Sequence, residues 1–269
     1  MVDGTYPMIG NTNHVNENYP DLVNRRPGIK SVSPRISMEE NSPLIEGGIQ
    51  EGPFNGSIPT LTGRTSFNSE FTMYWVATAS SLMFTSTVWY IVLSAEHEFF
   101  IWHPIFMSTT LFLLTQGPLL LQTAETREEK EKGLNVHRSI QSLAFLTGIC
   151  GFYIIYTNKK DHNAEHFTSA HGMFGVLTLS LIFIQVLGGA LVVNAPALFG
   201  GVARARGIYK YHRISGYTIL LFAWLTALGG TQRDWVTDRF NHIWFWLLAF
   251  TLTWIGIGSR VKLNKMKVL

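Results

Sequence analysis

The chain has 269 residues, of which 46% are hydrophobic and only 14% are charged, whereas about 25% of the residues in soluble domains are charged. A third of the charged side chains fall within residues 1–70, and the others form short clusters that leave six uncharged stretches: 71–95, 99–124, 139–158, 166–203, 214–232 and 240–259. Each stretch has about the 20 residues that a helix needs to cross a bilayer. This pattern excludes a soluble globular protein and predicts an all-α membrane protein with six transmembrane helices. No basic stripe carries interleaved aromatic residues, which argues against nucleic-acid binding.

Residues 1–70 are rich in Asn, Pro, Ser and Gly and show neither helical nor strand periodicity. Such a segment cannot bury enough apolar surface to offset the entropy of ordering, so we expect it to be disordered. It also lacks the basic region and compact apolar region of a signal peptide, which predicts that it stays in the cytosol. We therefore expect a disordered cytosolic tail (1–70), a transmembrane domain (71–260) and a basic cytosolic C-terminal tail (261–269).

The six expected helices span residues 72–94, 103–122, 138–157, 168–193, 213–230 and 240–259. Lys and Arg residues in short loops favour the cytosolic side of a membrane. On one side we count Arg127, Lys130, Lys132, Arg138, Arg204, Arg206, Lys210, Arg213, Arg260, Lys262, Lys265 and Lys267, and on the other side only Lys159, Lys160, Arg233 and Arg239. Both termini are therefore expected in the cytosol, with the loops at 95–102, 159–167 and 231–239 on the opposite side.

Four of the nine histidines recur at the start of successive expected helices: His103, His137, His171 and His212. Because successive helices run in opposite directions, His103 and His171 are expected together near the non-cytosolic side, and His137 and His212 together near the cytosolic side. A lone histidine at a helix end is usually an interfacial residue solvated by water. Four of them in alternation favour a functional reading, since ionisable groups inside a membrane are costly, and helix bundles bind cofactors between facing side chains.

The residue types narrow the choice of metal. Zinc requires three or four protein ligands, and neither histidine pair has a Cys or carboxylate companion in the sequence. Two opposed imidazoles suit haem iron, giving a six-coordinate centre that carries electrons rather than binding oxygen. Many two-haem membrane proteins place two ligands on one helix about four turns apart, but here Gly117 and Gln185 occupy those positions. Each haem is therefore expected between two different helices.

Four segments carry a specific resemblance: HPIFMSTTLFLL (103–114), VHRSIQSLAF (136–145), TSAHGMFGVL (168–177) and KYHRISGY (210–217). In this order they resemble the motifs of the cytochrome b561 family, and most closely its short branch that consists of the b561 domain alone. The resemblance covers about residues 72–260. It departs at Ser169–Gly175, where the family usually has S-L-H-S-W-x-G and this chain keeps the small residues but changes an aromatic position.

The resemblance implies a transmembrane oxidoreductase with two haem b groups, usually a homodimer, whose helices 2–5 form the haem-binding core. It implies electron transfer from cytosolic ascorbate to monodehydroascorbate or a ferric chelate on the other side. His103 and His171 would be the axial ligands of the non-cytosolic haem iron, and His137 and His212 those of the cytosolic haem iron. Because ascorbate is an anion, Lys210 and Arg138 beside the cytosolic ligands are its candidate contacts, although such cations also serve topology alone.

Two alternatives stay open from the sequence: a haem redox sensor that signals through its tail, and a non-enzymatic membrane transporter whose histidines relay protons. The tail also holds an acidic dileucine-like pattern, Glu40 four residues before Leu44 and Ile45. On a cytosolic tail this pattern predicts sorting to an endosomal, lysosomal or vacuolar membrane. The cations and histidines of the non-cytosolic loops, among them Lys159, His166 and Arg233, are usually solvated loop residues, but could attract an anionic acceptor.

Overall fold

A computed structural model describes residues 62–121 and 126–261. Throughout these residues the regular structure is helical. The elements are α1 (Thr62–Leu93), η1 (Phe99–Ile101), α2 (Trp102–Leu121), α3 (Arg127–Asp161), α4 (Ala170–Asn194), η2 (Pro196–Phe199), α5 (Val202–Thr231), α6 (Asp234–Thr237) and α7 (Ile243–Ser259). The dileucine-like pattern at Glu40, Leu44 and Ile45, most of the expected N-terminal tail and nearly all of the C-terminal tail lie outside the described residues.

Five of the described helices, α1 to α5, are long and apolar enough to cross a membrane. The sixth expected span corresponds to α7, which is strongly apolar but has only 17 residues. At 1.5 Å per residue it is about 25 Å long, slightly less than the roughly 30 Å of a bilayer's hydrocarbon core. The all-α membrane fold is thus supported with five clear spans.

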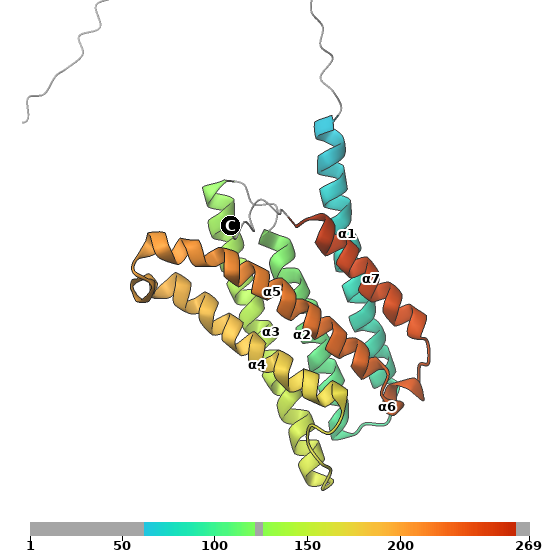
Figure 1. Cartoon of the computed structure of the whole chain (residues 1–269). Helices are drawn as coiled ribbons and strands as arrows, with labels where there is room; N and C mark the ends of the chain where they lie inside the picture. Colours follow the sequence, from blue (N-terminus) through green and yellow to red (C-terminus); the bar gives the residue numbers. More distant parts are fainter. Residues whose placement is uncertain (1–61, 122–125, 262–269) are drawn as a thin grey trace, which may run out of the picture. The chain divides into compact units, whose positions relative to one another are not determined.

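Helices α2, α3, α4 and α5 form a ring in which each helix packs against two others: α2 on α3 and α5, and α4 on α3 and α5. Outside this ring α1 pairs with α7, and this pair contacts the ring through α2 and α5. Figure 1 shows that α2 and α4 begin at one end of the bundle, whereas α3 and α5 begin at the opposite end. This antiparallel order determines which histidines can meet.

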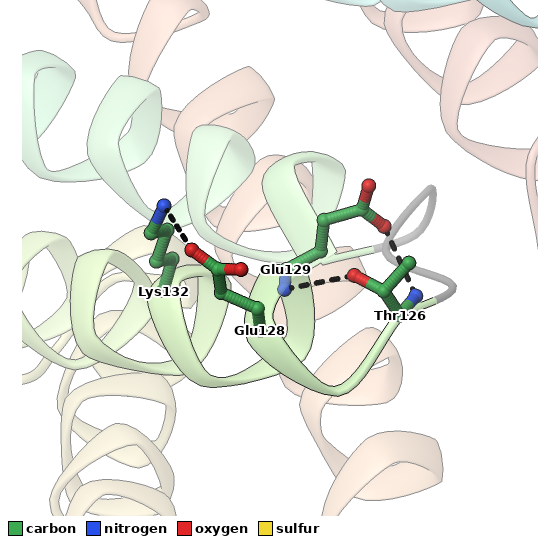
Figure 2. Close-up of polar contacts among 4 residues, drawn as sticks. All are labelled: Thr126, Glu128, Glu129 and Lys132. Atoms are coloured by element: carbon green, nitrogen blue, oxygen red, sulfur yellow. Dashed lines mark hydrogen bonds and ion pairs between the residues drawn. The ribbon is translucent and has the colours of Figure 1, made fainter. Parts of the chain in front are cut away.

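Helix α3 begins eleven residues earlier than the sequence suggested. Its first turn is closed by a capping box (Figure 2): the Thr126 hydroxyl accepts from the Glu129 amide at 3.2 Å, and the Glu129 carboxylate accepts from the Thr126 amide at 3.1 Å. One turn further, Glu128 and Lys132 form an exposed ion pair at 2.7 Å. Such contacts allow a charged segment to continue the helix beyond the apolar stretch.

The other unexpected helix extensions are in α1 and α5. Helix α1 begins at Thr62, so residues 62–70 are helical instead of belonging to the disordered tail. Helix α5 begins at Val202, directly after Gly200 and Gly201, whose φ angles of 79° and 100° suit glycine. Consequently the expectation that all four histidines start their helices is wrong for two of them. His137 and His212 lie about three turns inside α3 and α5, where the apolar segments begin, whereas His103 and His171 do lie in the first turn of α2 and α4.

The α1–α7 pair is fastened to the ring by aromatic and polar contacts in the interior. Phe84 of α1 meets the buried Trp224 and Trp246 with ring centroids 5.1 Å and 5.0 Å away, and Trp224 Nε1 donates to the Thr115 hydroxyl at 3.1 Å. At the far end of α7, the guanidinium of Arg260 donates to the carbonyl oxygens of Glu70 and Leu119.

Candidate haem sites

The first candidate site lies where α2 and α4 begin. His103 and His171 face each other with ring centroids 6.3 Å apart and ring planes at 81°. Two imidazoles that share one metal ion, each with a nitrogen about 2 Å from it, have centroids about 6 Å apart. The structure therefore brings this predicted pair together at a separation that one metal ion can bridge.

Both rings of this pair are oriented from behind by backbone carbonyl groups. His103 Nδ1 lies 2.9 Å from the carbonyl oxygen of Gly151 on α3, and His171 Nδ1 lies 2.9 Å from that of Thr226 on α5. Because a carbonyl oxygen only accepts, each Nδ1 carries the proton and each Nε2 presents its lone pair. This is the tautomer and the support that metal-bound histidines usually have. All four ring helices thus contribute to the pair.

A cavity of about 470 Å³ surrounds the pair and is lined mostly by apolar side chains. Its volume lies within the roughly 300–1,000 Å³ of typical cofactor pockets. Glycines widen it: a Cβ on Gly230 would lie 2.9 Å from His171 Cε1, and a Cβ on Gly148 would lie 3.3 Å from Leu179 Cδ1. The cavity and its two inward nitrogens fit a large, flat, mostly apolar metal complex such as haem.

The second candidate site lies at the other end of the ring, between α3 and α5. His137 and His212 are close enough to interact electrostatically. His137 Nδ1 is buried, and although the backbone of Gly117 lies beside it, it has no hydrogen-bond partner among the described residues. A Cβ on Gly189 of α4 would lie 2.8 Å from His212 Cε1, so only glycine leaves the ring in place. An unpartnered buried nitrogen beside a second imidazole is a donor set that also fits haem iron.

The donor chemistry argues against a purely protein-bound metal. Among the described residues, no three His, Cys, Asp or Glu side chains gather as a metal cluster. A two-imidazole set leaves the remaining ligands to be supplied by the cofactor, as a porphyrin does. The residues at both sites therefore fit haem better than zinc, which requires a larger protein ligand set.

The two candidate ascorbate contacts lie near the second pair. Arg138 follows His137 and donates from its Nη2 to the Asn194 side-chain oxygen at 3.3 Å, which ties α3 to the end of α4. Lys210 lies two residues before His212, with its Nζ 5.1 Å from the centre of the Tyr211 ring. Both residues thus border the end of the ring at which His137 and His212 lie.

Several loop residues of the opposite end line the 470 Å³ cavity, namely Lys159, His166 and Arg233. The His166 ring stacks on Tyr156 with centroids 4.4 Å apart, and Lys159 Nζ donates to the Glu165 carbonyl oxygen. By contrast, Arg239 covers the Trp235 ring at 4.3 Å.

Sequence reasoning missed the residues of α4 that face His212. Gln185 Nε2 donates to the His212 carbonyl oxygen at 2.6 Å, and the Ser215 hydroxyl donates to Gln185 Oε1 at 2.8 Å. Gln185 was noted only as an absent ligand. A polar residue in the middle of an apolar transmembrane segment was the available signal, because such side chains usually bond across helices.

Residues 102–238, about half of the chain, match the family described as eukaryotic cytochrome b561. The chain belongs to the cytochrome b561 family. The match begins at the first residue of α2 and ends just after α6, so it contains the whole four-helix ring and all four histidines. As the term cytochrome denotes a haem protein, this membership agrees with the fit of both histidine pairs.

Individual relatives are distant. A mouse (Mus musculus) protein, "Transmembrane reductase CYB561D2", is 28% identical over 142 residues, which are 51% of this chain and 63% of that protein. "Transmembrane ascorbate-dependent reductase CYB561", also from mouse, is 29% identical over 131 residues, 48% of this chain and 51% of that protein. "Transmembrane ascorbate ferrireductase 2" of Arabidopsis thaliana is 27% identical over 180 residues, with shares of 65% and 76%. The alignments thus span about half to two thirds of each mouse relative's length.

Proposed function

We infer that this chain is a transmembrane oxidoreductase that carries electrons from cytosolic ascorbate to monodehydroascorbate or a ferric chelate on the other side. The observation that carries the proposal is the pair of histidine pairs, one at each end of a single four-helix ring. Relatives whose names specify ascorbate-dependent reduction support the donor. The proposal includes six membrane crossings, with α7 as the sixth, and cytosolic termini.

In this proposal His103 and His171 hold one haem b, and His137 and His212 hold the other. Haem bound between two imidazoles supplies one-electron transfer without an open coordination position. The chain's own contribution is orientation and exclusion of water. The carbonyl oxygens of Gly151 and Thr226 keep the Nε2 atoms of His103 and His171 turned toward each other, and apolar side chains around the cavity keep the site dry.

At the cytosolic end, Lys210 and Arg138 are the proposed contacts of ascorbate. Their positive charges favour the approach of an anion toward the end where His137 lies. Oxidation of one ascorbate gives one electron, one proton released to the cytosol and monodehydroascorbate, and the electron reduces one acceptor on the other side. A membrane potential that is negative in the cytosol favours this outward movement by about 2.3 kcal/mol per charge per 100 mV.

A sided assay tests the function. The full chain is reconstituted into vesicles that enclose ferric citrate and a ferrous-iron indicator, and ascorbate is added outside. We expect ferrous iron to form inside, and Lys210→Ala to raise the KM for ascorbate without loss of absorbance from haem. Vesicles with the double variant His137→Ala and His212→Ala should stay inactive. Absence of internal ferrous iron, in vesicles whose protein holds haem and is oriented both ways, would contradict the proposal.

A further inference from the structure

The proposal concerns the level of α4 and α5 at which His212 lies, and it rests on the proposed haem site between His137 and His212. Gln185 on α4 reaches across to α5, where its Nε2 donates to the His212 carbonyl oxygen at 2.6 Å. This carbonyl belongs to the ligand residue itself. Any change in the contact therefore acts directly on the backbone from which the imidazole projects.

A second residue fixes the Gln185 amide. The Ser215 hydroxyl donates to Gln185 Oε1 at 2.8 Å, which leaves the amide nitrogen pointing at the His212 carbonyl group. Ser215 lies one turn after His212 on the same face of α5. The carboxamide is therefore held at both ends, by the acceptor at His212 and the donor at Ser215, and its orientation is determined by the sequence of α5.

Two glycines allow this close approach. A Cβ on Gly216 would lie 3.0 Å from Gln185 Nε2, and a Cβ on Gly189, one turn after Gln185, would lie 2.8 Å from His212 Cε1. Larger residues at either position would separate α4 from α5 or displace the ring. The helices are thus shaped at this level for one amide and one imidazole.

The two histidine pairs differ in how they are supported. At the other end, the imidazole Nδ1 atoms of His103 and His171 bond to carbonyl oxygens of neighbouring helices. His212 has no such ring contact among the hydrogen bonds that the described residues show, and its support acts on the main chain through Gln185. In a low-dielectric environment without competing water, such an interhelical bond is persistent.

We propose that Gln185 is a positioning residue for His212: its amide, oriented by Ser215, fixes the depth and rotation of α5 so that the imidazole faces His137. Gln185 does not touch the cofactor in this role and acts through the ligand's backbone. Outer partners of metal ligands commonly alter metal retention by about 10- to 100-fold when they are removed. We expect an effect near the low end for Gln185, because it holds the ligand through the main chain.

The test uses the purified full chain and two readouts other than activity: the low-temperature electron paramagnetic resonance spectrum, and the rate at which haem transfers to excess apomyoglobin. His212→Ala first identifies which low-spin signal belongs to this pair. Gln185→Leu should then shift that signal and speed haem loss from this pair about tenfold, while the signal that depends on His103 stays unchanged. Ser215→Ala should have a smaller effect, and adding it to Gln185→Leu should change nothing further, since the two side chains act as one unit.

Two controls separate positioning from general loosening of the helices. Thr178→Val removes the 3.2 Å hydrogen bond between Thr178 and Thr226, which also joins α4 to α5, and it should leave the His212 signal in place. Thr218→Val removes an exposed hydroxyl of α5 that bonds only within its own helix among the contacts described, and it should alter neither signal.

The outcomes are distinct. If His212→Ala retains two haems per chain, the proposed haem site fails regardless of Gln185. If His212→Ala loses one haem but Gln185→Leu leaves both the signal and the rate of haem loss unchanged, the positioning role is refuted. It is refuted as well if Thr178→Val shifts the His212 signal as much as Gln185→Leu does.

Discussion

Replacing Gly230 by alanine should selectively weaken the non-cytosolic site. The added Cβ would lie 2.9 Å from His171 Cε1 and 3.3 Å from Nδ1. To reach an ordinary contact of 3.4 Å, the ring must move about 0.5 Å, a shift of the kind that overpacking imposes at a cost of about 1–3 kcal/mol. The same movement strains the 2.9 Å bond between His171 Nδ1 and the Thr226 carbonyl oxygen.

This cost corresponds to about 5- to 150-fold weaker retention of the cofactor at that pair. The helix itself should not suffer, because alanine is favoured over glycine in a helix interior by about 1 kcal/mol. Gly229→Ala is the matched control, since its Cβ would lie 4.0 Å from the nearest His171 atom. The assay is haem per chain after detergent purification, with the electron paramagnetic resonance signal of each site.

We expect Gly230→Ala to approach one haem per chain and to lose the signal that also disappears in His171→Ala, whereas Gly229→Ala should resemble the wild type. Two full signals in Gly230→Ala, with wild-type retention of both haems, would refute the reasoning that the cavity holds a ligated His171 at this position.

Three further predictions follow from the geometry. His103→Ala and His171→Ala should each remove the same haem, and the double variant should remove no more, as quantified by haem extraction; losses that add up would contradict the pairing. Gly189→Ala should weaken haem retention at the His137–His212 pair, whereas Gly188→Ala, whose Cβ would meet nothing within 4 Å, should not; equal behaviour of the two in apomyoglobin transfer would count against the site. Arg260→Ala should lower the thermal midpoint in detergent, because it leaves the buried carbonyl groups of Glu70 and Leu119 without this donor at about 1–3 kcal/mol; an unchanged midpoint would exclude this tie between helices.

Much of the candidate site was predictable because alternation along the chain determines which end of an antiparallel bundle a residue reaches. His103 and His171 were paired on this basis alone, and their rings face each other in the structure. The same argument placed His137 with His212, and the two do interact. The uncharged stretches likewise predicted five spans that the structure contains.

The helix starts were not predictable from charge segregation. The segment Arg127–Lys132 was assigned to a loop because it is charged, yet its capping box and ion pair make it the first turns of α3. Charge marks where a helix leaves the apolar core of the membrane, and says little about where its hydrogen bonding ends. This is why His137 lies inside its helix instead of at its start.

The contacts of Gln185 with His212 and Ser215 could not be predicted for a different reason. They depend on how far α4 and α5 are rotated about their axes and how closely they approach, which no periodicity in a uniformly apolar segment specifies. Gly189 and Gly216 were recognised as residues that give room, but the groups that occupy this room, the His212 ring and the Gln185 amide, follow only from the assembled bundle.

The central claim is that two histidine pairs hold two haems which ascorbate reduces. The most direct measurement is a reduced-minus-oxidised absorbance spectrum of the purified chain with ascorbate as the reductant, combined with haem per chain. We predict a sharp six-coordinate b-type band, two haems per chain and rapid reduction. Haem that ascorbate does not reduce would contradict the proposed donor and favour a redox sensor. A colourless protein from haem-sufficient cells would contradict the electron-transfer role itself.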